Sequence, residues 1–253
     1  MRYTTSRIME CMAGDVCKLC GDEGELLASH VLPEFFYEAA YDESHRFVSV
    51  SNHPRHRPRA LLQKGLTEHL LCAACERRFS RYESYSATLL RRIDAAMDGV
   101  SDGAPIADVD FTTFRLFGLS LLWRSHIARH YMFGQVDLGP LAERLRAMLR
   151  TEQSGAPHEY GFAIAKVAGL GTRGDMISSP TRSKYRGLRT YSLMARGYEW
   201  AFVVSQDSAA MIDHVPFVGT DTVTLWVPTI QLNQGALFAR LRHAFPKALG
   251  RKP

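Results

Sequence analysis

The sequence lacks several features that would assign it to a familiar class. It contains no Walker-type phosphate loop. The spacings Gly-x-Gly-x-x-Gly (169–174) and Gly-x-Ser-x-Gly (99–103) each occur once, but neither stands between an expected strand and an expected helix, as these motifs require, so nucleotide hydrolysis and serine esterase chemistry have no support. The apolar run at 116–123 is far shorter than the roughly 20 residues that a membrane helix needs. The first residues lack the apolar stretch of a secretion signal. We therefore expect a cytoplasmic protein with no membrane partner.

Cysteine is scarce, but its spacing is regular. Four of the five cysteines form two Cys-x-x-Cys pairs, Cys17 with Cys20 and Cys72 with Cys75, and Cys11 stands outside them. Two such knuckles are typical of a tetrahedral structural zinc site. Buried thiols without a metal would leave the repeated spacing unexplained. We predict a Zn²⁺ site at these four residues, and we expect the first hundred residues to depend on it for folding.

An excess of basic residues allows, but does not require, a polyanionic partner. Lysine and arginine number 31 against 26 acidic residues, which gives a formal charge of +5. Arg55, Arg57 and Arg59 lie in the segment 42–65, whose loop-like composition, with two prolines beside these arginines, predicts an exposed loop. These arginines could contact nucleic-acid phosphates without sequence preference. A solvated surface loop is the alternative.

Hydrophobic periodicity predicts an α+β protein. Short strands are expected at 26–32 and 66–71, each next to a knuckle, and a helix is expected from Cys75 onward. Asp110 is a good N-cap for a helix over 111–131 that is apolar on nearly every side, so it should lie in the core. An amphipathic helix is expected around 141–149 and a last one at 236–245.

The second half predicts an antiparallel sheet. Residues 160–167, 188–193, 199–204 and 222–227 are rich in β-branched and aromatic residues, and no long helix separates them. The Gly- and Pro-containing cluster at 101–105 is the best boundary between two parts. We therefore divide the chain into a zinc-binding module at 1–100 and an α+β region at 101–253.

Residues 15–90 contain several motifs in a fixed order: a knuckle, a strand ending in Ser29-His30-Val-Leu-Pro33, a loop, a second strand, Leu-Leu-Cys72-x-x-Cys75 and a helix. This order resembles the HNH (treble-clef, ββα-metal) endonuclease superfamily. His30 matches the histidine that acts as general base in that superfamily. Ser29, Thr67 and Glu76 stand where the superfamily typically has a carboxylate, an asparagine and a histidine.

The resemblance implies a metal-dependent endonuclease acting on DNA or RNA, in bacterial defence or mobile-element biology. Glu76 and Glu83 lie seven residues apart and so project from nearly the same face of the helix. With His30 opposite, they could hold Mg²⁺ or Mn²⁺ through oxygen ligands while His30 activates water. The alternatives are a solvated helix face for both glutamates and a packing role for His30.

Two functions therefore remain open from the sequence. The first is an HNH-like endonuclease with His30, Glu76 and Glu83 as catalytic residues. The second is a catalytically inactive, zinc-stabilised module that binds nucleic acid or protein. Residues 101–253 carry no motif that assigns a function, and they could serve a protein partner or a homo-oligomer. Arg124 and its neighbours at 126–130 predict a polar edge on an otherwise apolar helix.

Overall fold

The computed structural model describes residues 15–38, 40–50, 59–63, 65–169, 176–185, 187–209, 217–219 and 223–231, and nothing is inferred for the others. The described residues form a mixed α+β fold, as predicted. Cys11, Arg55, Arg57 and the helix expected at 236–245 lie outside the described residues. Within the described residues, no helix is both long and apolar enough to span a bilayer.

The helices match most of the expected positions. They are α1 (Glu34–Glu38), α2 (Ala73–Ala96), α3 (Phe111–Ile127), α4 (Leu141–Thr151) and a short 3₁₀ helix, η1 (Tyr131–Phe133). The side chain of Asp110 accepts a hydrogen bond from the N–H of Thr113 at 3.0 Å, so the predicted N-cap of α3 is confirmed. The predicted end of α3 was too late, because Ala128 already adopts an extended conformation.

The strands form three sheets in the described residues. β1 (Leu26–His30) pairs antiparallel with β4 (Thr67–Cys72) in a two-stranded sheet. β2 (Phe47–Val50), β3 (Arg59–Leu62) and β7 (Ile177–Ser178) form a second sheet in the order β3-β2-β7. The six-stranded third sheet has the order β5-β11-β6-β10-β9-β8.

The third sheet contains the strands expected in the second half, together with β5 and β8. Its members are β5 (Gly103–Ile106), β6 (Phe162–Ala168), β8 (Thr181–Tyr185), β9 (Leu188–Ala195), β10 (Tyr198–Val203) and β11 (Leu225–Gln231). All of its neighbours are antiparallel except β11 and β6, which run parallel. Pro105 is tolerated in β5 because this strand lies at the edge of the sheet.

The segment expected to be a loop at 42–65 contains a β-hairpin instead. β2 and β3 pair through it, and Phe47 in β2 is 1% exposed. The ring of Phe47 lies 4.9 Å from that of Tyr37 in α1. The contact between these two aromatic residues, ten positions apart, thus stabilises β2, a strand that its polar sequence neighbours did not predict.

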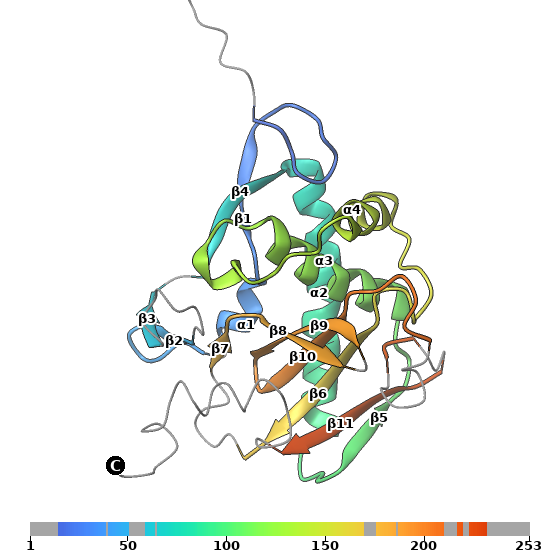
Figure 1. The fold of residues 1–253 in the computed structure, drawn as a ribbon. Helices are drawn as coiled ribbons and strands as arrows, with labels where there is room; N and C mark the ends of the chain where they lie inside the picture. The colour runs from blue at the N-terminus through green and yellow to red at the C-terminus, as the bar shows by residue number, and fades with distance from the viewer. Residues whose placement is uncertain are drawn as a thin grey trace, which may run out of the picture.

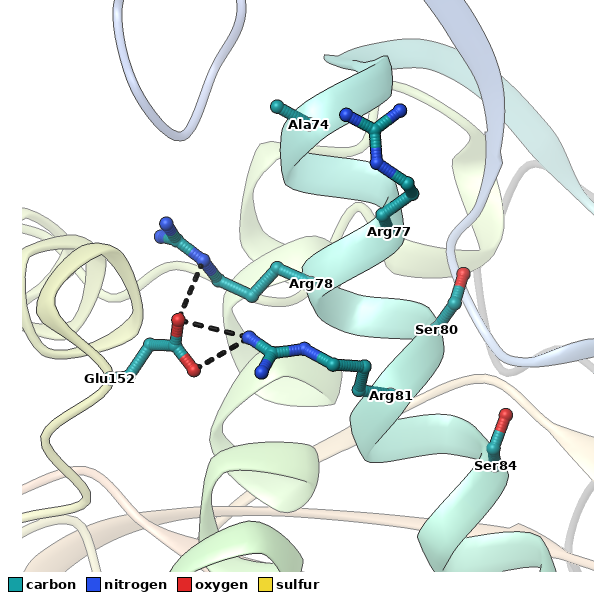
Figure 2. A pocket seen from close by; sticks show the side chains of 7 residues that line it. All are labelled: Ala74, Arg77, Arg78, Ser80, Arg81, Ser84 and Glu152. Carbon is teal, nitrogen blue, oxygen red and sulfur yellow. Dashed lines mark hydrogen bonds and ion pairs between the residues drawn. The ribbon is translucent and has the colours of Figure 1, made fainter.

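Helix α2 connects the first sheet to the third. Figure 1 shows it running through the middle of the molecule, from the end of β4 toward β5. One face packs against α3, and its buried residues are Cys75, Phe79, Tyr82, Ser86, Leu89, Leu90 and Ile93. Its exposed side carries Arg77 and Arg81, as Figure 2 shows.

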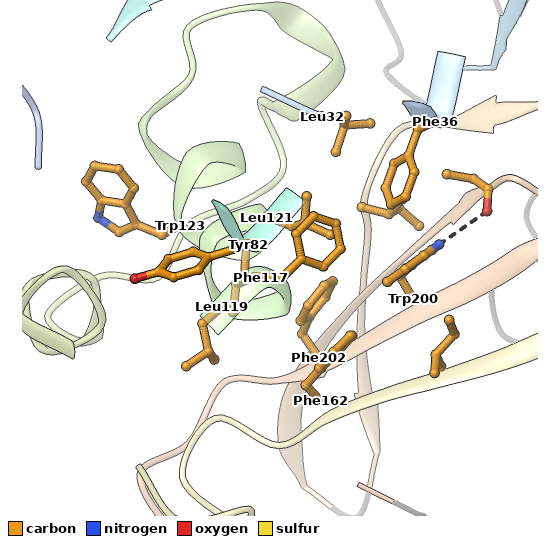
Figure 3. Packing of buried hydrophobic residues seen from close by; sticks show 14 of the residues in the cluster. Leu32, Phe36, Tyr82, Phe117, Leu119, Leu121, Trp123, Phe162, Trp200 and Phe202 are labelled. Carbon is orange, nitrogen blue, oxygen red and sulfur yellow. Dashed lines mark hydrogen bonds between the residues drawn. The ribbon is translucent and has the colours of Figure 1, made fainter. Parts of the chain in front are cut away.

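A single hydrophobic cluster contains residues from both predicted parts of the chain. Around Trp200 in β10, aromatic rings come from α1 and α3 as well as from the sheet (Figure 3). The ring of Phe36 lies 4.9 Å from Trp200, and that of Phe117 lies 5.8 Å from it. The position at 101–105 therefore separates two stretches of sequence that share one core.

Candidate functional site

The two cysteine pairs converge, as their spacing predicted. Four Sγ atoms lie within 4.8 Å of one another, those of Cys17, Cys20, Cys72 and Cys75. The Sγ atoms of Cys20 and Cys72 are 3.9 Å apart, which is far too long for a disulfide. Tetrahedral Zn²⁺ with Zn–S bonds of about 2.3 Å would place its sulfurs about 3.8 Å apart. The four thiols can therefore hold a metal ion, and their geometry is consistent with structural zinc.

Backbone geometry and one distant arginine hold the first knuckle in place. Gly21 has φ of 87°, a left-handed conformation that glycine adopts easily, and its N–H donates to the carbonyl of Cys17 at 2.9 Å. Arg146 in α4 donates from Nε to the carbonyls of Lys18 and Leu19 at 2.9 and 2.8 Å. The region after residue 100 thus stabilises the first knuckle.

The thiols differ in acidity. Burial alone would raise the pKa of Cys17, but backbone N–H groups, that of Cys72 first, lower it to about 7. Burial raises the pKa of Cys20 to about 11 and also raises that of Cys75. A bound cation would favour the thiolate form of all four residues.

His30 lies at the end of β1, and its side chain is 34% exposed. Its Nε2 is 2.8 Å from Oε2 of Glu34, and the hydroxyl of Tyr41 donates to Oε1 of Glu34 at 3.1 Å. Pro33 immediately precedes α1, and Glu34 lies in the first turn of this short helix, four residues after His30. His30 is thus accessible to solvent and oriented by a carboxylate, unlike a packing histidine.

Glu76 faces the same strand from the first turn of α2. The hydroxyl of Ser29 donates to its Oε2 at 2.9 Å. Burial raises the pKa of the Glu76 carboxyl, while the hydrogen bond from Ser29 and the charge of Arg124 oppose the shift. The solvated helix face considered for Glu76 does not describe this half-buried, hydrogen-bonded side chain.

Glu83 lies two turns further along α2 and pairs with Arg124 of α3. Nη1 of Arg124 is 2.7 Å from Oε1 of Glu83 and also donates to the main-chain carbonyl of His30 at 2.7 Å. The Arg124 side chain is 1% exposed, and its guanidinium lies 5.3 Å from the ring centroid of Phe79. The prediction that Arg124 forms a polar edge of its helix was wrong, because the residue is buried between α2 and β1.

The structure therefore brings His30, Glu76 and Glu83 to one region but does not assemble them into a cation site. Among the described residues, the four cysteines are the one group of three or more His, Cys, Asp or Glu residues at metal-ligand spacing. His30 contacts Glu34, Glu76 contacts Ser29, and Glu83 contacts Arg124.

Sequence reasoning did not assign a role to Glu34, Arg124 or Arg146. Glu34 could have been noticed as a carboxylate four residues after His30, close enough in the sequence for the two side chains to meet. Arg124 and Arg146 act through contacts with residues that are distant in sequence, and no local pattern identifies them. Of the predicted nucleic-acid contacts, Arg59 begins β3, and the other two lie outside the described residues.

Comparison with models of protein families gives no match for this chain. Searches of curated proteins and of solved structures give no significant match either.

Proposed function

We propose that this protein is a metal-dependent endonuclease of the HNH type, built on a zinc-stabilised treble-clef module. One observation carries the proposal: β1 and α2 face each other beside the four-cysteine centre, with Ser29 joined to Glu76 and Arg124 joining Glu83 to His30. A solvent-accessible histidine and two carboxylates are the groups that metal-assisted phosphodiester hydrolysis needs.

His30 is the general base in this proposal. An ionised Glu34 accepts the Nε2 proton of His30, which leaves Nδ1 as the basic nitrogen. Within the described residues Nδ1 has no hydrogen-bond partner, so a water molecule can reach it. The hydrogen bond from Arg124 to the carbonyl of His30 holds the main chain at this position.

In this proposal Glu76 and Glu83 are the ligands of Mg²⁺ or Mn²⁺, and their side chains must move to metal-ligand spacing when the ion binds, because they do not lie at that spacing here. Across the described part of the chain, Oε1 of Glu76 and Oε2 of Glu83 have no partner, so each carboxylate retains one oxygen for a cation. A bound divalent ion would stabilise negative charge that develops on the phosphate. Ser29, which replaces the carboxylate typical of the superfamily, orients Glu76 instead of binding metal directly.

A second function, an inactive zinc-stabilised binding module, is favoured by a different observation. Each candidate catalytic side chain already has an intramolecular partner, as expected for residues that stabilise the fold. In this case β1, β4 and α2 form a scaffold, and recognition takes place elsewhere on the surface.

A nuclease assay distinguishes the two functions. Wild type and His30→Ala are compared on plasmid, single-stranded DNA and RNA, with Mg²⁺, with Mn²⁺ and without added divalent ion, after zinc content has been shown to be equal. We expect divalent-dependent cleavage by the wild type and a loss of about 10²–10⁴-fold in His30→Ala. His69→Ala is the matched control, because His69 is an exposed histidine on the neighbouring strand β4.

Each of the two functions predicts a different result in this assay. Cleavage that is lost in His30→Ala and kept in His69→Ala supports the endonuclease. Equal cleavage by the wild type and His30→Ala indicates a contaminating nuclease and contradicts the proposal. Nucleic-acid binding without cleavage under any of these conditions supports the inactive module.

A further inference from the structure

The exposed side of α2 carries a cluster of arginines next to the face that holds Glu76 and Glu83. This α2 surface is a hollow lined by Ala74, Arg77, Arg78, Ser80, Arg81, Ser84 and Glu152. Successive helix positions are about 100° apart, so Arg77 and Arg81 lie about a quarter of a turn or more from the carboxylate face. Three arginines against one glutamate give the surface a net positive charge.

Arg78 is not available for a ligand, because it stabilises the protein. Its Nη1 donates to the carbonyl of Arg150 at 2.7 Å and to that of Leu149 at 3.4 Å, at the C-terminal end of α4. Its Nε lies 3.3 Å from Oε1 of Glu152. Arg78 thus satisfies carbonyls that the end of the helix leaves unpaired.

Arg77 and Arg81, in contrast, are exposed, and the partner of Arg81 in the described residues is Glu152. Arg81 has a side chain that is 65% exposed, and its Nη2 lies 2.8 Å from Oε2 of Glu152. An exposed ion pair of this kind contributes little free energy, so a phosphate can replace the carboxylate at low cost. Arg77 is exposed and has no ion-pair partner within the described residues. Figure 2 shows the guanidinium group of Arg77 extending beside the start of α2 and that of Arg81 directed toward Glu152, with Ser80 and Ser84 on the opposite edge of the helix in this view.

Glu152 is the acidic residue among those that line the α2 surface. It adopts a left-handed conformation (φ 58°) just after α4, and the hydroxyl of Tyr82 donates to its Oε2 at 3.1 Å. The carboxylate is thereby held against Arg78 and Arg81. A negative charge in this position competes with any anion that approaches Arg81.

We propose that Arg77 and Arg81 bind the phosphate backbone of a nucleic acid, and that Glu152 weakens this binding by occupying Arg81. Guanidinium groups bind phosphate oxygens in bidentate fashion, and contacts of this kind carry no sequence preference. The inference rests on the proposed function in naming nucleic acid as the ligand. It assigns the contact to α2, whereas the sequence had suggested the loop at 55–59.

The test is a binding measurement by fluorescence anisotropy, with a short labelled DNA duplex and the corresponding single strand. It is carried out without added divalent ion, so that no cleavage takes place, and salt is varied between about 50 and 200 mM. The variants are Arg77→Gln, Arg81→Gln, their combination and Glu152→Gln. Glutamine is a good helix former and leaves the exposed positions of α2 intact.

Each lost phosphate contact should weaken affinity by roughly tenfold near 0.1 M salt and lower the salt slope by about 0.9 for duplex DNA. The double variant should therefore lose roughly a hundredfold. Glu152→Gln should bind severalfold more tightly than wild type, which a damaged fold could not produce. Arg144→Gln is the matched control: Arg144 is 55% exposed on α4, pairs with Glu159 and lies outside the α2 surface.

Equal losses in Arg144→Gln and Arg81→Gln would overturn the inference, because the effect would then reflect net charge alone. Unchanged binding in the double variant would also overturn it. If these variants bind normally while the wild type cleaves with Mg²⁺, the inference fails and the nuclease stands. If the α2 surface binds DNA and no cleavage is found, the inference stands and the nuclease fails.

Discussion

The two parts of this chain are stabilised in different ways. Around β1, β4 and the start of α2, the structure depends on a cluster of four cysteines and on polar contacts from α3 and α4. Around Trp200, it depends on aromatic packing, in which Phe162 lies parallel to Trp200 at 6.0 Å and Phe202 is stacked on Phe162 at 5.4 Å. The first region has two short strands and a cysteine cluster that could hold a metal ion, whereas the second has a group of packed aromatic rings.

The comparison also shows which contacts position the residues of the candidate site. His30, Glu76 and Glu83 belong to the region beside the four cysteines, but Arg124, which connects two of them, comes from α3 in the apolar core. The larger region thus provides a rigid support for the smaller one. This dependence predicts that the first hundred residues alone would not hold His30 correctly.

The largest effect is expected from loss of the metal. Cys72→Ser, or a strong chelator added to the wild type, should unfold the region that contains β1 and β4, because structural zinc contributes on the order of 10 kcal/mol. Hydrogen exchange measured by mass spectrometry should show loss of protection in β1 and β4 well before β9 and β10. Cys11→Ser, a cysteine outside both knuckles, is the control. Unchanged protection after complete metal removal would contradict the proposed dependence.

A smaller but still large effect is expected from Arg124→Met. This change leaves Glu83 without its partner and the carbonyl of His30 without its donor, and breaking a buried ion pair costs about 3–5 kcal/mol. The free energy of unfolding is measured by urea denaturation. Arg124→Met with Glu83→Gln should recover part of the loss, because the unpaired charge is then removed. Simple additivity of the two single changes would argue against direct coupling between these residues.

The smallest of the three effects is expected in the apolar core. A Cβ atom at Gly118 would lie 2.6 Å from the ring of Phe162, so Gly118→Ala should cost about 1–3 kcal/mol by overpacking. The better helix propensity of alanine, worth up to about 1 kcal/mol, offsets part of this loss. Gly134→Ala is the control, because its Cβ would meet one atom at 3.4 Å. Thermal denaturation of both variants provides the measurement, and equal stability would show that the core can adjust around Phe162.

Local patterns in the sequence predicted much of the fold. Asp110 predicted the start of α3 because capping depends on the N–H groups of the next three residues. A high content of β-branched and aromatic residues predicted β6, β9 and β10, because such side chains favour strands. The hairpin of β2 and β3 was missed, since Phe47 is buried by a contact with Tyr37 that its polar sequence neighbours do not reveal.

For the site, the sequence by itself identified four candidate metal ligands, since two knuckles of equal spacing can converge on one ion. It also placed Glu76 and Glu83 on one face of α2. Only the tertiary structure decided that Arg124 is buried between Glu83 and the carbonyl of His30, which lies 94 positions earlier in the chain. It likewise placed Glu152 against Arg81. Contacts between distant segments depend on how helices and sheets pack, and spacing along the chain carries no information about them.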